Sequence, residues 1–242
     1  EVVAQLANWQ PDVGVVAAYG EILRRNVLEI PPLGYINIHP SLLPRYRGPT
    51  PVHAAILGGD AETGVTVMRL DARMDSGPIL AQERVPLPSD ARNGPLTNEL
   101  FAHGSRLLLG ALAAYADGSL QPAPQDDAQA TYCAMLQKSD GVIDWNVPAA
   151  QIERMTRAYD PWPGAQTTWQ GQPFKIIAAR AEPAASGDAA PGTLLLRPNG
   201  VAVATGDGAL ELLTVQPAGK RPLPASAWRN GLHSTAVAHL GG

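Results

Sequence analysis

The chain has 242 residues, a formal net charge of −4 at pH 7 and 45% hydrophobic residues, enough for one large domain or two ordinary ones. This hydrophobic content excludes a disordered chain. The single cysteine, Cys133, excludes a disulfide framework and a thiolate metal cluster, and it fits a reducing, cytoplasmic compartment. Because no stretch approaches the ~20 apolar residues of a membrane span, we expect a soluble protein with no membrane partner.

Acidic and basic residues are unevenly distributed along the chain. Residues 1–137 hold nine Lys or Arg and fourteen Asp or Glu, whereas residues 138–242 hold nine and eight. The second part of the chain is therefore the better candidate for contact with an anionic partner.

The first half of the chain shows strand patterns that alternate with helix patterns. In chain order we expect a helix at 4–10, a strand at 13–19, a short helix at 21–28, a strand at Tyr35–His39, a helix at 52–57, strands at 64–70 and 79–85, and a long helix at 96–116. The apolar run at 13–19 is typical of a strand buried on both faces. The alternation favours an α/β fold with a parallel sheet.

Residues 120–131 are polar and rich in proline, which is typical of a linker. We therefore place a first domain at 1–118, a linker at 119–137 and a second domain at 138–242. The second domain is expected to contain a helix at Ala149–Ala158 and five short strands at 166–169, 174–179, 193–196, 201–205 and 209–215. Short strands separated by turn residues favour a small β-barrel or sandwich.

Polar residues gather where two predicted strands of the first domain end. Asn37 and His39 are two residues apart on one strand, so their side chains leave the same face near its C-terminal end, where ligands bind in open α/β sheets. Asp75 lies in the loop after the strand at 64–70. Asn and protonated His can donate to an oxyanion, and Asp can orient His, stabilise its charge or receive a proton. Together the three residues suit acyl-type transfer.

A purely structural interpretation of these residues is also open. Asn or His at a strand end commonly caps a turn, and the Asp within residues 73–77 (RMDSG) is a natural turn residue. The chain contains no G-x-G-x-x-G, P-loop, G-x-S-x-G or H-E-x-x-H motif, and its five histidines lack the spacing of metal ligands.

Two separated segments, residues 37–44 (NIHPSLLP) and 74–80 (MDSGPIL), resemble the two signatures of the folate-dependent formyltransferases. The resemblance implies a Rossmann-like sheet of the formyltransferase type, with Asn37, His39 and Asp75 as the catalytic residues. It also implies that the folate is contacted by Ser41, Leu42, Leu43 and Pro44. The expected formyl donor is 10-formyltetrahydrofolate, and no metal is required.

Further segments resemble the branch of that family that formylates methionyl-tRNA. They are residues 45–48 through 59–66, which the sugar-modifying branch shares, residues 130–145 with 157–158 and 161–165, and residues 205–208 with 215–221. The resemblance implies that the acceptor is the α-amino group of methionyl initiator tRNA, for translation initiation, and that the second domain is an OB-like barrel that helps to hold tRNA. The family begins with strands and a helix upstream of residue 1, so we expect this chain to start inside its first domain.

The resemblance also suggests a division of roles at the site. Asn37 and His39 would stabilise the oxyanion that forms when the amine attacks the formyl carbon. Asp75 would keep His39 protonated and relay the proton toward the departing N10. No covalent enzyme intermediate is required.

Five basic residues are candidates for tRNA contact. Arg45 and Arg47 flank Tyr46 beside the predicted site, where a solvated loop and a phosphate contact are both open interpretations. Lys138, Lys220 and Arg221 lie in the less acidic half, although surface Lys and Arg commonly serve only solubility.

Two other functions stay open. A sugar-nucleotide N-formyltransferase would use the same three residues, and an inactive RNA-binding remnant would keep the motifs but bind folate weakly or not at all. The sequence leaves the oligomeric state open, with a monomer favoured.

Overall fold

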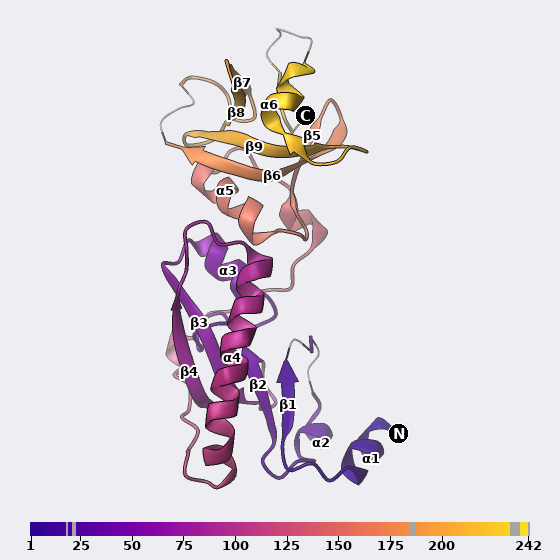
Figure 1. Cartoon of the computed structure of the whole chain (residues 1–242), viewed down its shortest axis with the longest axis vertical. Coiled ribbons are helices and arrows are strands. Elements are labelled where there is room, and N and C mark those ends of the chain that lie inside the picture. The colour runs from indigo at the N-terminus through magenta and orange to yellow at the C-terminus, as the bar shows by residue number, and fades with distance from the viewer. Residues whose placement is uncertain (18, 21–22, 184–186, 233–237, 242) are drawn as a thin grey trace. The chain divides into compact units, whose positions relative to one another are not determined.

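The computed structural model describes residues 1–17, 19–20, 23–183, 187–232 and 238–241. The chain divides into two compact units, one of residues 1–91 with 95–135 and one of residues 92–94 with 136–242 (Figure 1). The segment expected as a linker is packed within the first unit as far as Met135. Within the described ranges, no helix combines the length and the apolar character needed to cross a membrane.

The first unit is built on a mixed four-stranded sheet. Its strands follow one another in the order β1 (Gly14–Ala17), β2 (Tyr35–His39), β3 (Glu62–Arg69) and β4 (Ile79–Pro86). The prediction of a parallel sheet is confirmed only for β1 and β2, because β3 runs antiparallel to both of its neighbours. The connection from β3 to β4, residues 70–78, is shorter than the dozen or more residues that a parallel crossover requires.

One long helix covers a face of this sheet. α4 (Asn93–Ala116) runs along the strands in Figure 1. The core between them consists of buried apolar side chains from the strands and the helix: Ile36, Ile38, Val65, Val67, Leu80, Leu108 and Tyr115. The remaining helices are α1 (Val2–Asn8), α2 (Arg25–Leu28), α3 (Pro51–Gly58) and the short 3-10 helix η1 (Asp127–Gln129).

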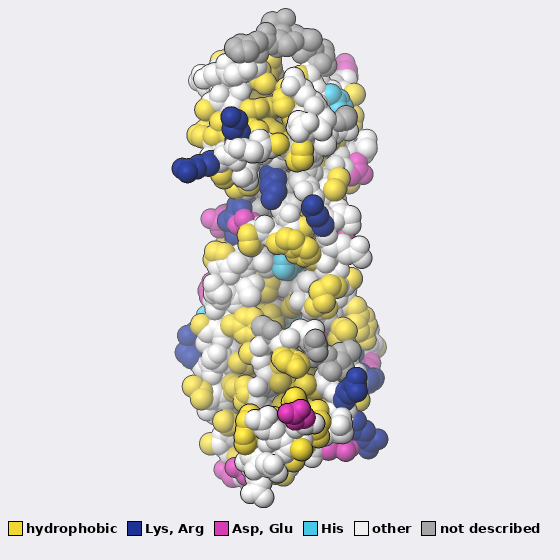
Figure 2. Space-filling view, turned by 90° about the vertical axis from the view of Figure 1, so that its right-hand side faces the viewer, with side chains coloured by type: hydrophobic (Ala, Val, Ile, Leu, Met, Phe, Trp, Pro, Cys, Tyr) yellow, Lys and Arg dark blue, Asp and Glu magenta, His cyan; other side chains and the backbone are white. Residues whose placement is uncertain are grey.

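β1 is less buried than its apolar sequence predicts. Val15 is 53% exposed and Ala17 is also exposed, so the expected burial on both faces is wrong. Apolar side chains gather on the surface over α1, α2 and β1 (lower part of Figure 2); the exposed ones are Val2, Val3, Trp9, Val15 and Tyr19. β1 pairs only with β2 among the described strands, which leaves its other edge and this face uncovered.

The described residues of the second unit form an antiparallel sheet, two α-helices and a 3-10 helix. The sheet has the order β5 (Ala165–Trp169), β6 (Gln172–Glu182), β9 (Ala209–Pro217), β8 (Gly200–Ala204) and β7 (Leu194–Arg197), with β10 (Leu223–Pro224) paired to β9. The helices are α5 (Ala149–Ala158), α6 (Ala225–Asn230) and the 3-10 helix η2 (Lys138–Gly141). α6 was not expected, and its Trp228 packs against Trp169 and Phe174, with ring centroids 5.4 and 4.7 Å away.

The expected OB-like barrel does not close in the part of the chain that is described. β5 and β7 do not pair, because residues 238–241 lie between their edges. The Leu194 N–H donates to the Ala238 carbonyl, and the Gly241 N–H donates to the carbonyl of Thr168 on the other side. Leu240 is fully buried at this position. Direct pairing of the outer strands, which a closed barrel needs, is thus replaced by this segment.

Two glycines of α4 provide a test of how the helix packs on the sheet. A Cβ at Gly104 would overlap the Ile38 side chain and lie 2.7 Å from Val65, whereas a Cβ at Gly110 would meet nothing within 4 Å. We expect Gly110→Ala to stabilise the protein by up to about 1 kcal/mol through helix propensity. Gly104→Ala should destabilise it by about 1–3 kcal/mol, because overpacking outweighs propensity. Urea unfolding of both variants measures the difference, and equal stabilities would contradict this packing.

Candidate active site

β2 positions the first two predicted site residues. Asn37 and His39 lie on one face of this strand, near its C-terminal end. His39 is only 4% exposed, whereas Asn37 is half-buried. Within the described residues, the Asn37 amide has no hydrogen-bond partner, although both ends of an amide can bond. Its donor is therefore available to a ligand.

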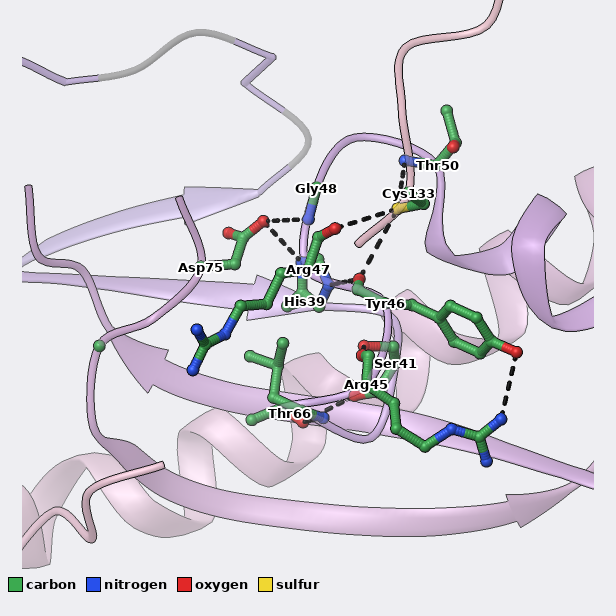
Figure 3. A network of polar contacts seen from close by, with 12 residues as sticks. His39, Ser41, Arg45, Tyr46, Arg47, Gly48, Thr50, Thr66, Asp75 and Cys133 are labelled. Atoms are coloured by element: carbon green, nitrogen blue, oxygen red, sulfur yellow. Dashed lines mark hydrogen bonds and ion pairs between the residues drawn. The ribbon is translucent and has the colours of Figure 1, made fainter. Parts of the chain in front are cut away.

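The structure brings Asp75 to His39, as Figure 3 shows. Asp75 Oδ2 lies 3.7 Å from His39 Nδ1 and accepts a hydrogen bond of 2.8 Å from the Gly48 N–H. Asp75 has a left-handed φ of 47°, a conformation that Asp adopts more readily than most residues. The loop from β3 to β4 and the loop after β2 thus meet at this carboxylate.

The second ring nitrogen of His39 is also engaged. Nε2 lies 2.9 Å from the Tyr46 carbonyl oxygen. Because a carbonyl can only accept, Nε2 carries the hydrogen in the neutral ring, and the basic nitrogen is Nδ1, which faces Asp75. Burial lowers the pKa of His39 from 6.5, against the opposing effects of Asp75 and the Tyr46 carbonyl. Burial thus favours the neutral ring, whereas the resemblance implies a ring that Asp75 keeps protonated, and that role of Asp75 stays a prediction.

The loop expected to contact folate is held in place by two polar side chains from the sheet. Thr66 Oγ1 donates to the Ser41 carbonyl at 2.6 Å and accepts from the Leu43 N–H at 3.1 Å. Gln82 Nε2 donates to the Leu43 carbonyl at 2.9 Å and to Thr66 Oγ1 at 2.8 Å. Ser41 and Leu43 are buried, whereas Leu42 and Pro44 are partly exposed. The loop is therefore held by hydrogen bonds from within the protein.

Arg45 and Arg47 point in different directions. The Arg45 guanidinium is exposed, lies 5.0 Å from the Tyr46 ring centroid and pairs with Asp60 at 3.0 Å. The Arg47 side chain is only 2% exposed. Its guanidinium donates to Gln125 and Asp127 and, at 3.3 Å, to the Tyr132 hydroxyl. Arg47 therefore has almost no exposed surface with which to touch a phosphate.

The three other predicted tRNA contacts belong to the second unit. Lys138, Lys220 and Arg221 are exposed, and Lys138 begins η2. The cluster around His39 belongs to the first unit.

Residues 125–134 contribute to the site, although nothing in the sequence predicted it. Thr131 Oγ1 accepts a hydrogen bond of 2.8 Å from the Tyr46 N–H, and Cys133 Sγ accepts one of 3.4 Å from the Thr50 N–H (Figure 3). Burial raises the pKa of the Cys133 thiol. Because these contacts join residues more than 80 positions apart, no local pattern of sequence indicates them.

Comparison with known families accounts for both units. Residues 1–112 match the family described as formyl transferase, and residues 135–233 match the one described as formyl transferase, C-terminal domain. Among solved structures, HypX from Aquifex aeolicus in complex with tetrahydrofolic acid has a TM-score of 0.69 at 24% identity, over 98% of this chain and 41% of that one. Methionyl-tRNA formyltransferase from Clostridium thermocellum has a TM-score of 0.59 at 17% identity, over 74% of this chain and 77% of that one. Both share the fold.

Sequence relatives cover almost the whole chain. Methionyl-tRNA formyltransferase from Roseiflexus castenholzii (strain DSM 13941 / HLO8) is 67% identical over 99% of this chain and 77% of its own length. The protein of that name from Chloroflexus aggregans (strain MD-66 / DSM 9485) is 59% identical over 98% of this chain and 77% of its own length. The chain therefore belongs to the formyltransferase family.

Proposed function

We propose that the protein transfers the formyl group of 10-formyltetrahydrofolate to the α-amino group of methionyl initiator tRNA, for translation initiation in the cytoplasm. The observation that carries the proposal is the buried His39, paired with the partly buried Asp75, on the same strand face as an Asn37 amide that has no hydrogen-bond partner among the described residues. The acceptor is inferred from the relatives, which are methionyl-tRNA formyltransferases at up to 67% identity over 99% of this chain.

The chemistry follows from the state of the three side chains. The amine attacks the formyl carbon, a C–N bond forms, and the carbonyl oxygen becomes an oxyanion to which the Asn37 amide donates. Neutral His39 accepts the proton of the attacking nitrogen at Nδ1, and the Asp75 carboxylate stabilises the resulting imidazolium. The same proton then passes to N10 as the C–N10 bond breaks, which returns His39 to its neutral form.

The loop of residues 41–44 is proposed as one wall of the folate site. Thr66 and Gln82 satisfy the polar backbone of Ser41 and Leu43, which leaves the partly exposed Leu42 and Pro44 to contact an apolar ring. A wall of this kind loses little conformational entropy when the co-substrate binds.

Contact with tRNA is proposed for exposed cations only. Lys138, Lys220 and Arg221 are exposed in the less acidic half of the chain, and Arg45 is exposed beside the catalytic cluster. Each is suited to a phosphate contact. For the buried Arg47 we propose a structural role.

The first prediction concerns catalysis. Asn37→Ala, His39→Asn and Asp75→Asn should each lower kcat by ~10²–10³-fold, because each removes a group that acts in the transition state. The measurement is formyl transfer to methionyl initiator tRNA. His103→Asn is the control, since His103 pairs with Glu83 outside the cluster. Transfer to an amino-sugar nucleotide and not to the tRNA would reject the proposed acceptor.

The second prediction concerns pH. Neutral His39 is the active form, so kcat/KM should rise with pH as His39 loses its proton, with a midpoint below 6.5 because burial lowers this pKa. Asp75→Asn removes a carboxylate that raises the pKa of His39, so the residual activity should have its acid limb at lower pH. His53→Asn is the control, because burial also lowers the pKa of His53. An acid limb that does not move in Asp75→Asn would contradict this assignment.

The third prediction concerns tRNA binding. Lys138→Ala, Lys220→Ala and Arg221→Ala should each raise the KM for tRNA, leave kcat unchanged and reduce the slope of log K against log salt by about 1. Arg84→Ala removes a surface charge that is paired with Glu62 and serves as the control. Unchanged salt slopes in all three variants would exclude these residues as phosphate contacts.

A further inference from the structure

We propose that Gln125 is a positioning residue for the Asp75–His39 pair, and that the segment of residues 123–134 is a brace of the catalytic site. The inference rests on the proposed function for its kinetic consequences. Its structural part rests on contacts that involve no substrate.

The Gln125 amide uses both of its ends. Its Oε1 accepts hydrogen bonds of 3.0 and 2.8 Å from Nε and Nη2 of Arg47. Its Nε2 donates to the carbonyls of Asp75 and Gly77, at 2.9 and 2.7 Å. One side chain thus joins the loop after β2 to the loop between β3 and β4, and it does so at the backbone of a catalytic residue.

Asp75 needs such support for two reasons. Its φ of 47° lies in the left-handed region, which costs free energy unless surrounding contacts maintain it. Its carboxylate lies 3.7 Å from His39 Nδ1, so a small rotation of the backbone changes the interaction between the two side chains. Gln125 holds the Asp75 carbonyl, and the Gly48 N–H holds the carboxylate.

The other end of the brace, residues 131–133, holds the loop that contains Tyr46, whose carbonyl contacts His39. The Arg47 N–H donates to the Thr131 carbonyl at 2.9 Å, and the Cys133 N–H donates to the Arg47 carbonyl at 2.8 Å. A Cβ at Gly48 would collide with the Cys133 carbonyl, so the two segments are in close contact. The loop fixed in this way contains both the Tyr46 carbonyl and the Gly48 N–H, which contact His39 and Asp75.

Two variants separate positioning from simple anchoring. Gln125→Leu removes all four hydrogen bonds. Gln125→Glu keeps an acceptor for Arg47 but places a carboxylate against the carbonyls of Asp75 and Gly77. Gln129→Ala is the matched control, since Gln129 is exposed on the same segment and, among the described residues, its side chain bonds only Asp126.

We expect both Gln125 variants to lower kcat by about 10- to 100-fold with little change in the KM for either substrate. The acid limb of the pH profile of each Gln125 variant should move toward that of Asp75→Asn, because the Asp75 carboxylate shifts away from His39. The Cys133 thiol is a second titratable group that interacts with Asp75, and Cys133→Ser should leave the acid limb of the Gln125 variants unchanged. Gln129→Ala should match the unaltered protein.

Three results would overturn the inference. A normal kcat in Gln125→Glu would reduce Gln125 to an anchor for Arg47. A lower melting temperature of the Gln125 variants with an unmoved acid limb would show only a loss of stability. An equal loss of kcat in Gln129→Ala would show that the effect is not specific to Gln125. The His39 imidazole titration, followed by NMR without substrate, keeps the test independent of the proposed reaction. If the protein makes no formyl-methionyl-tRNA while the His39 pKa still moves in Gln125→Leu, the function fails and the positioning role stands.

Discussion

The burial of one imidazole is the constraint on which the rest of the site depends. His39 is 4% exposed, and a buried polar atom without a partner costs about 1–3 kcal/mol. The Tyr46 carbonyl and the Asp75 carboxylate face the two ring nitrogens, and they come from loops after different strands. Both loops must therefore keep their positions for the ring to stay buried. The hydrogen bonds of Thr66, Gln82, Gln125 and Thr131 serve this requirement, because each ties a loop to the sheet or to another loop.

Local patterns were sufficient for the strand that carries Asn37 and His39 and for one helix of the second unit. β2 and α5 have the predicted bounds, because a short apolar strand ended by a proline and an amphipathic helix leave clear periodic signals. Asn37 and His39 share a strand face for the same reason. The reversed direction of β3, the segment 238–241 between β5 and β7, and the contacts of Gln125 all depend on residues distant in sequence. Periodicity within one segment contains no information about such partners.

The two arginines beside Tyr46 illustrate this limit at a single loop. Their residue type and their position next to a catalytic cluster made both candidates for phosphate contact. The fold separates them, since Arg45 faces solvent beside Asp60 and Arg47 is buried among Gln125, Asp127 and Tyr132. A buried guanidinium requires several acceptors in fixed geometry, and a polar segment that resembles a linker supplies them. The polar side chains of Gln125 and Asp127 within residues 120–131 therefore serve as acceptors for the buried Arg47 guanidinium.

The roles that Asn37, His39 and Asp75 can have in the reaction depend on whether the His39 ring is neutral or charged. An imidazole next to a carboxylate is expected to be charged, and a charged ring would donate to the oxyanion. Burial acts in the opposite direction, and it is the largest influence on the pKa of this ring. A neutral ring bound through Nε2 to a carbonyl has one free function, which is to accept a proton at Nδ1. In the proposed mechanism, the amide of Asn37 is then left to stabilise the oxyanion, and the Asp75 carboxylate acts only once His39 has become charged. If the mechanism proceeds as proposed, the position of Asp75 matters most after the amine has attacked, so we expect a brace on its backbone to affect turnover more than substrate binding.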